Sequence, residues 1–308
     1  MKYEDWILDW LETYIKPSTK MRTYERYFGI CTLHIIPNIG DYELKDLTII
    51  ELQKLVTKML AVGNHQTGAG LSANFVNTII SVLQNSLKTA HLIGLTPKYV
   101  ANNIKRPKAI EKQVECFSMS EQKKIEGYIL NCKKDKMFGI LLCLYTGLRI
   151  GELLAIKWQD IDINKGLLYV SKTCYDGNVN GVHTRIIDSP KTVSSRRVIP
   201  LPKQLLPMLK ELKKRSKCEW VIADEESPIY VRSYQRTFEL LLKKLGIAHK
   251  GFHSLRHTFA TRALECGMDV KTLSELLGHK NATVTLNRYA HSLLEHKTDM
   301  MNRLGKLL

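Results

Sequence analysis

The sequence lacks the patterns that mark secreted, disulfide-bonded or membrane-spanning proteins. Its longest apolar run, residues 137–145, is far shorter than the ~20 residues that a helix needs to cross a bilayer. The N-terminus has neither the basic start nor the apolar stretch of a secretory signal. The seven cysteines are odd in number and form no C-x-x-C pair, which disfavours a disulfide framework and a zinc ribbon. We therefore expect a cytoplasmic protein that makes no contact with a membrane.

Internal repeats and low-complexity tracts are also absent, so the domain boundaries must come from composition and from changes of hydrophobic period. A chain of 308 residues is longer than one hydrophobic core usually serves, and two domains are expected. The segment 102–115 is polar, charged and proline-containing, which is typical of an exposed linker. The predicted organisation is a first domain at 1–101, a linker at 102–115 and a second domain at 116–308 that ends in a C-terminal tail.

Acidic residues are few compared with basic ones. Lys and Arg number 46 against 30 Asp and Glu, which gives a formal charge of +16. A charge of this size creates a field that attracts polyanions, and nucleic acid is the leading partner. Charge alone leaves two alternatives open, a basic protein without such a partner and a membrane-surface binder.

The first domain shows helical patterns throughout. Thr48 and Glu51 make a capping box ahead of an apolar series, and Ser72 can cap a second helix. Residues 18–34 carry aromatic and apolar residues at mixed spacings of three and four, with cations between them. The cations are Lys20, Arg22 and Arg26. They form either a DNA-binding face or an ordinary solvated face.

The second domain mixes helical and β-rich patterns. Ser118 and Glu121 make another capping box. Residues 185–187 and 196–201 are β-rich and flank a turn-like segment, so we expect them to form a hairpin, and 167–174 is a further β-rich run. The chain becomes helical again from Gln204. The predicted fold is mainly α with a small antiparallel β-sheet.

Three parts of the second domain concentrate residues suited to chemistry on a phosphate. They read TGLRIGEL at 146–153, SPKTVSSRRVIPL at 189–201, and HSLRH at 253–257 with LGH at 277–279 and Tyr289 behind it. Guanidiniums grip phosphate oxygens in pairs and stay charged at any relevant pH. These segments resemble the signature boxes of the tyrosine recombinase or phage integrase family.

The first domain resembles the same family. TYERY at 23–27 and HIIPNIGD at 34–41 are similar to its helical, SAM-like core-binding domain, so the resemblance covers nearly the whole chain. It implies a tyrosine-recombinase catalytic domain after the linker, and it implies the catalytic residues Arg149, Lys191, His253, Arg256, His279 and the nucleophile Tyr289.

The roles that the resemblance implies agree with the chemistry of each side chain. Arg149 and Arg256 would clamp the non-bridging oxygens of the phosphate. Tyr289 would attack the phosphorus and form a 3′-phosphotyrosyl link, which conserves the bond energy for rejoining. Lys191 would protonate the departing 5′ oxygen. Because a tyrosine has a pKa of ~10, it needs a base, for which His253 is the candidate.

Two further roles complete this site. His279 would donate a hydrogen bond to the phosphate, and it could exchange roles with the candidate base. Glu152, one helical turn from Arg149, would orient that guanidinium. Taken singly, each of these residues is more often a solvated or packing residue, and Arg149 with Glu152 could be a plain helix surface pair. The joint order and spacing of the six residues favour the catalytic interpretation.

No metal or other cofactor is expected. His253 and His257 stand four positions apart, but the glutamate of an H-E-x-x-H site is missing and Arg256 lies between them. Residues 263–277 offer a rival function, because their apolar spacing, the internal Gly267 and a Thr272–Glu275 capping box resemble a helix-turn-helix. A non-catalytic DNA-binding regulator is therefore the alternative, and a type IB topoisomerase or chromosome-dimer resolvase would share the chemistry.

The resemblance also implies partners and a setting. It implies double-stranded DNA with specific core sites, a tetramer of protomers on that DNA, and a possible directionality or DNA-bending factor. The 189–201 box is most similar to integrases of phages and conjugative transposons, which favours integration and excision of a mobile element. The protein would be bacterial or phage-encoded, and nucleoid-associated when bound. Little room precedes the first domain for an arm-binding domain, and the apolar tail at 293–308 would dock on a neighbouring protomer or on its own domain.

Overall fold

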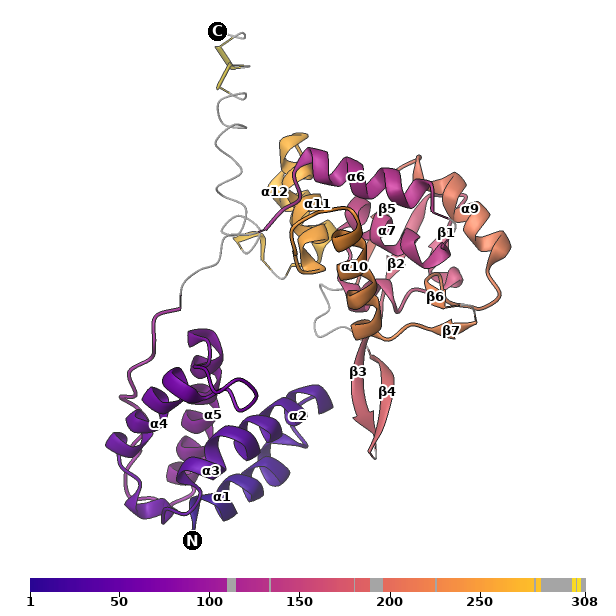
Figure 1. The fold of residues 1–308 in the computed structure, drawn as a ribbon. Coiled ribbons are helices and arrows are strands. Elements are labelled where there is room, and N and C mark those ends of the chain that lie inside the picture. The colour runs from indigo at the N-terminus through magenta and orange to yellow at the C-terminus, as the bar shows by residue number, and fades with distance from the viewer. Residues whose placement is uncertain are drawn as a thin grey trace. The chain divides into compact units, whose positions relative to one another are not determined.

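The computed structural model describes residues 1–109, 115–132, 134–179, 181–188, 196–224, 226–279, 281–283, 301–302 and 304–305. The chain divides into two compact units, Met1–Lys112 and Gln113–Leu308 (Figure 1). Each unit has a hydrophobic core of its own. The architecture is mainly helical with small antiparallel sheets, as the sequence predicted.

The N-terminal unit is a bundle of helices without a sheet among its described residues. Its α-helices are α1 (Tyr3–Trp10), α2 (Met21–Ile30), α3 (Ile36–Ile39), α4 (Ile49–Val62) and α5 (Ala73–Leu92). The π-helical segments Leu11–Ile15 and Cys31–Ile35 extend α1 and α2. The predicted apolar face of α5 is buried, including Val76, Ile80 and Leu83, and the predicted cap is confirmed by the bond from the Phe75 N–H to the Ser72 hydroxyl at 3.3 Å.

The predicted capping box at Thr48 is wrong in its bonding, although α4 begins where it was expected. The Thr48 hydroxyl donates to the carboxylate of Glu51, and no side-chain bond caps the backbone of α4. The two side chains satisfy each other, so neither is available to the N–H groups of the first turn. The helix is held by its buried face instead, at Leu52, Val56 and Met59.

The second unit is built around α7. Its α-helices are α6 (Met119–Leu130), α7 (Phe138–Thr146), α8 (Ile150–Leu153), α9 (Leu205–Arg215), α10 (Val231–Lys244), α11 (His253–Glu265) and α12 (Val270–Leu277). The longest apolar run of the sequence forms α7, which is buried nearly all round and packs against α11. Among the described residues, no helix has the length and apolarity that a membrane span requires. The capping box of Ser118 and Glu121 at the start of α6 is confirmed.

The strands pair differently from the prediction. A three-stranded antiparallel sheet joins β1 (Ile161–Asp162), β2 (Leu167–Val170) and β5 (Arg197–Pro200), in that order, and the short strands β6 (Ala223–Asp224) and β7 (Ser227–Pro228) form a separate pair. A long hairpin joins β3 (Thr173–Val179) to β4 (Val182–Asp188) and extends away from the rest of the unit (Figure 1).

The expected hairpin between 185–187 and 196–201 is therefore wrong. Asp176 lies opposite Arg185, and Leu168 opposite Ile199. The turn that closes the real hairpin contains Gly181, whose φ of 81° suits a glycine turn. The predicted turn of that hairpin, residues 189–194, lies outside the described residues.

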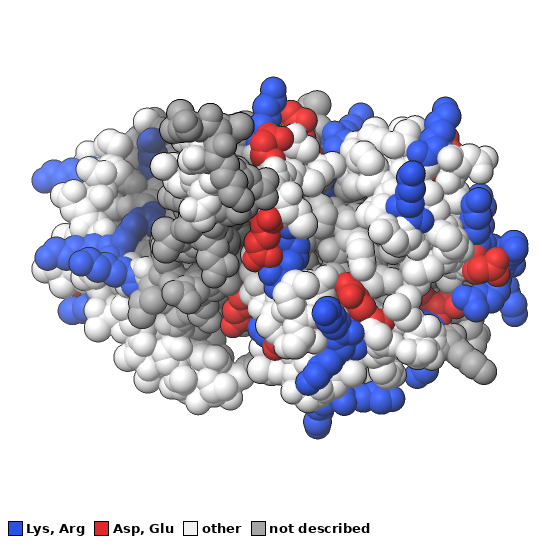
Figure 2. Space-filling view, turned by 90° about the horizontal axis from the view of Figure 1, so that it is seen from above, with Lys and Arg blue, Asp and Glu red and all other residues white. Residues whose placement is uncertain are grey.

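The surface carries the excess of positive charge. On the face seen in Figure 2, Lys and Arg side chains project from many points and Asp and Glu are fewer. On this face the cations are spread over many points, as expected for a charge of +16 that acts as a field over a broad area.

Candidate functional site

Arg149 stands at the junction of two helices. α7 ends at Thr146, Gly147 adopts a left-handed φ of 66°, and Arg149 occupies the N-cap position of α8. Glu152 then binds Arg149 twice: Oε1 accepts from Nη1 at 2.7 Å, and Oε2 accepts from the backbone N–H at 2.9 Å. The predicted pair is confirmed, and Glu152 holds both the guanidinium and the turn that carries it.

Gly147 is required at this junction for two reasons. A positive φ strains any residue that has a Cβ. A Cβ here would also lie 2.5 Å from Cδ1 of Phe259 and 2.9 Å from Cδ2 of Leu277. The close approach lets the carbonyl of Gly147 face α11.

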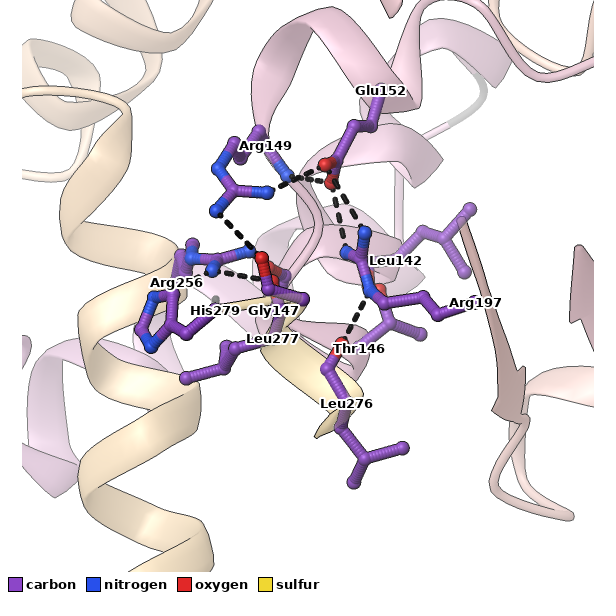
Figure 3. A network of polar contacts seen from close by, with 11 residues as sticks. Leu142, Thr146, Gly147, Arg149, Glu152, Arg197, Arg256, Leu276, Leu277 and His279 are labelled. Atoms are coloured by element: carbon purple, nitrogen blue, oxygen red, sulfur yellow. Dashed lines mark hydrogen bonds and ion pairs between the residues drawn. The ribbon is translucent and has the colours of Figure 1, made fainter. Parts of the chain in front are cut away.

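Arg256, on α11, is 1% exposed and binds the backbone of two other segments. Nη1 donates to the Gly147 carbonyl at 2.8 Å, and Nη2 donates to the Leu277 carbonyl at 2.6 Å. Nη2 also lies 2.9 Å from Nε2 of His279 (Figure 3). A guanidinium only donates, so Nε2 accepts in this arrangement. These bonds bring Arg149, Arg256 and His279 to one place.

α11 is anchored independently of these polar groups. The N–H of Phe117 donates to the Thr258 hydroxyl at 2.8 Å, and the Arg262 guanidinium donates to the Phe117 carbonyl at 3.0 Å. Lys250, just before α11, pairs with Glu121 at 2.7 Å. The start of the second unit and α6 therefore fix the helix that carries Arg256.

His253 opens α11 three residues before Arg256, which puts both on one side of the helix. Its ring meets that of His257 edge-on, with centroids 4.5 Å apart. Within the described residues, no group of three or more His, Cys, Asp and Glu side chains could hold a metal ion.

The structure adds Arg197 to the site, a residue for which no role was predicted. It lies on β5, and its side chain is 5% exposed. Nη1 and Nη2 donate to the two oxygens of Glu152 at 3.1 and 2.9 Å, and Nε donates to the Leu276 carbonyl at 2.5 Å. In Figure 3 Arg149 and Arg197 approach Glu152 from two sides. The signal in the sequence was a cation at the start of an otherwise apolar strand.

Glu152 remains ionised because of these two partners. Burial raises the pKa of its carboxyl, but the hydrogen bonds and charge of Arg197, together with the charge of Arg149, outweigh burial and lower the pKa to about 2. A buried carboxylate between two guanidiniums leaves one net positive charge, so the cluster can still attract a phosphate.

The helix pair α11 and α12 differs from the predicted helix-turn-helix at its second cap. α12 is capped by Asp269, whose carboxylate accepts from the Thr272 N–H at 2.9 Å, so the Thr272–Glu275 capping box is wrong. Asp269 is as good a cap as Thr272 and stands nearer the Gly267 turn. The pair brings Arg256 and His279 to the arginine cluster, an arrangement that a helix-turn-helix regulator does not require.

Lys191 and Tyr289 lie outside the described residues, as does most of the tail at 293–308. The described tail residues Met301 and Leu304 are 65% and 47% exposed. The roles of Lys191 and Tyr289, and the docking of the tail, stay predictions.

Comparison with known proteins gives matches along both units. Residues 119–296 match the model described as the phage integrase family, and residues 2–60 match its N-terminal SAM-like domain. A tyrosine recombinase XerC-like protein of Caldanaerobacter subterraneus subsp. tengcongensis is 32% identical over 97% of this chain and 81% of its own. The ICEBs1 integrase of Bacillus subtilis is 26% identical, over 88% of this chain and 75% of its own.

Solved structures share the fold. The Tn1549 transposon integrase in complex with transposon right end DNA has a TM-score of 0.82 at 22% identity, covering 99% of this chain and 100% of that one. A lambda integrase dimer bound to a core site has a TM-score of 0.70 at 22% identity, covering 92% and 97%.

Proposed function

The chain belongs to the phage integrase family, and on that premise we propose that it is a site-specific DNA recombinase that cleaves and rejoins DNA through a 3′-phosphotyrosyl intermediate. The observation that carries the proposal is the convergence of Arg149, Arg256 and His279 at one point of the second unit. These residues come from three separate segments of the sequence, and contacts through the Gly147 and Gly278 carbonyls bring them together, as a site for a single phosphate requires.

The two guanidiniums stabilise the charge that develops in the transition state. A phosphodiester that passes through a pentacoordinate state gathers charge on its non-bridging oxygens, and fixed cations stabilise that charge without reorganising. Arg149 is held by Glu152, and Arg256 by backbone carbonyls. Both heads are therefore oriented before DNA binds.

The remaining catalytic residues act on protons and on the covalent bond. The Tyr289 oxygen attacks the phosphorus, the 5′ oxygen of the DNA leaves, and Lys191 supplies its proton. His253 takes the proton of the tyrosine hydroxyl. His279 donates to the phosphate once its ring has given up the bond in which Nε2 accepts from Arg256. Rejoining reverses these steps and needs no nucleotide cofactor.

The two units divide the work of binding DNA. Residues 1–101 act as a core-type DNA-binding domain, 102–115 as a linker, and 116–308 as the catalytic domain with its tail. Phosphate contacts supply most of the affinity and base contacts the choice of site. Four protomers assemble on two sites, and the tail at 293–308 docks on a neighbour. If strand exchange and synapsis persist after deletion of that tail, the docking role is wrong.

The biological reaction is integration and excision of a mobile element in the cytoplasm, at the nucleoid. The test is a plasmid that carries the two ends of the flanking element. Purified protein should excise the segment between the two ends and leave a smaller plasmid circle whose junction is closed. Binding without any product would favour the regulator, and recombination only at a chromosome-terminus site would favour a resolvase.

A further inference from the structure

Three arginines bind three successive carbonyls at the end of α12. The Leu276 carbonyl accepts from Arg197 at 2.5 Å, the Leu277 carbonyl from Arg256 at 2.6 Å, and the Gly278 carbonyl from Arg149 at 3.5 Å. The last carbonyls of a helix have no partner within the helix, and they carry the negative end of its dipole. The end of α12 is thus a common anchor for all three guanidiniums.

The chain turns sharply at this point. Gly278 adopts a left-handed φ of 63°, and the N–H of His279 bonds back to the Ser274 carbonyl at 3.0 Å. His279 follows directly, so any shift of the α12 end moves its imidazole together with the arginine contacts.

Arg197 differs from Arg149 in its exposure, and from Arg256 in that both of its Nη atoms bind a charged carboxylate. Both of its Nη atoms are engaged by Glu152, and its side chain is 5% exposed, whereas the side chain of Arg149 is 36% exposed. Arg197 therefore acts on the phosphate only through its neighbours. Its two bonds fix the plane of the Glu152 carboxylate, and that plane sets the direction of Arg149.

The charge of Arg197 has an effect of its own. Without it, Glu152 would neutralise Arg149, and the pair would offer a phosphate no net charge. With it, the trio of Arg149, Glu152 and Arg197 keeps one positive charge in a mostly buried setting, where electrostatic interactions are strong.

We propose that Arg197 is a positioning residue of the phosphate site, which aims Arg149 through Glu152 and ties β5 to the end of α12. This inference rests on the proposed function. It explains why a cation occupies an inward position of β5, where an apolar residue would pack without desolvation cost.

The test variant is Arg197→Lys, which keeps the charge but loses the paired geometry. The control is Arg185→Lys. Arg185 on β4 also donates to a backbone carbonyl, that of Leu154, and its guanidinium lies 4.4 Å from the ring centroid of Trp220, but it does not touch Glu152 in the described contacts. Single-turnover formation of the protein–DNA adduct is measured at saturating DNA, beside DNA affinity and the melting temperature.

We expect Arg197→Lys to slow adduct formation about 10²-fold, the loss that a misplacement of about 1 Å can cause, with DNA affinity changed less than about threefold. Arg185→Lys should keep the wild-type rate. If Arg197→Lys reacts as fast as wild type, or if Arg185→Lys loses as much, Arg197 has only a structural role. No adduct with wild type would instead overturn the proposed function.

A second substrate tests whether Arg197 positions Arg149 or Lys191. Lys191 has to be considered because it lies only six positions before the start of β5. A 5′-bridging phosphorothiolate has a leaving thiolate that needs no proton, so it rescues a defect in the general acid. Lys191→Ala should recover on it and Arg197→Lys should not. Recovery of Arg197→Lys would overturn the assignment to Arg149.

The double variant Glu152→Gln with Arg197→Gln covers the case in which Arg197→Lys does not fold. It leaves no buried charge unpaired, and we expect it to fold and to bind DNA but to react about 10²-fold more slowly. A wild-type rate would contradict the inference.

Discussion

The Nη2 atom of Arg256 lies 2.9 Å from Nε2 of His279, and because the guanidinium can only donate, the imidazole accepts through that nitrogen. The proton of a neutral His279 is then on Nδ1. Arg256 therefore holds His279 in a form that cannot donate from Nε2.

This contact predicts the tautomer of His279. Long-range nitrogen–proton correlation spectra of the DNA-free protein should show the ring proton on Nδ1, and Arg256→Lys should weaken that preference. His253→Gln serves as the assignment control, because it removes one imidazole of α11 and leaves that of His279 in place. A dominant Nε2–H tautomer of His279 in the wild-type protein would contradict the contact.

Glu152→Gln should destabilise the second unit strongly. It breaks a buried ion pair and leaves Arg197 without a counter-charge, for which a loss of about 3–5 kcal/mol in the free energy of unfolding is expected. Denaturant unfolding measures it. Glu211→Gln is the matched control, because Glu211 pairs with Lys214 on the open surface, and its loss should change stability little. Equal losses would mean that the cluster contributes no more than a surface pair.

The acid stability of the protein should depend on the same carboxyl. Its pKa is lowered from the ordinary value of 4.5 to about 2, so its contribution is fully present above about pH 4.5 and is lost as the pH falls toward 2. Melting temperatures recorded through this window should fall less steeply for Glu152→Gln than for wild type. Parallel curves would show that other groups govern the acid transition.

Gly147→Ala should cost both stability and activity. Gly246 is the matched control, since it also has a positive φ, of 64°, but nothing within 4 Å of an added Cβ. We expect Gly246→Ala to lose about 1–2 kcal/mol from the backbone alone, and Gly147→Ala to lose about 1–3 kcal/mol more from overpacking against Phe259 and Leu277. Only Gly147→Ala should slow adduct formation, because its carbonyl binds Arg256. Equal effects of the two variants would show that the side chains of Phe259 and Leu277 move aside with little loss of stability.

DNA binding should weaken steeply with salt. The logarithm of the association constant is expected to fall linearly with the logarithm of the salt concentration, by about 0.9 for each phosphate contact. If the exposed cations Arg22 and Arg26 of α2 form a DNA-binding face, Arg22→Gln and Arg26→Gln should each reduce the slope by about one such step. An unchanged slope would mean that they are an ordinary solvated face.

The sequence predicted well what depends on neighbours in the chain. Ser72, and Ser118 with Glu121, cap helices because the partners lie three residues away. The apolar positions of α5 and the unbroken run of α7 are buried because periodicity and length determine which faces must leave water. The signature boxes led to the family by resemblance, and membership of that family is confirmed, whereas the catalytic roles of the residues within the boxes stay predictions.

What depends on distant partners was missed. β5 pairs with β2, and not with the nearer strand β4 as predicted, and nothing in the β-rich runs records that choice. One local prediction also failed, because Thr48 bonds to the side chain of Glu51 instead of a backbone N–H, a competition that the spacing of the two residues does not reveal. No role was predicted for Arg197, because its partners, Glu152 at 45 positions and Leu276 at 79, meet it only in the folded chain.

The most direct test of the account is covalent trapping. Wild type and Tyr289→Phe are incubated in EDTA with suicide substrates built from the ends of the flanking element, and protein–DNA adducts that resist denaturation are sought. The account predicts an adduct with wild type alone, undiminished by the chelator. Tight, specific binding without any adduct, or an adduct that needs a metal ion, would contradict it.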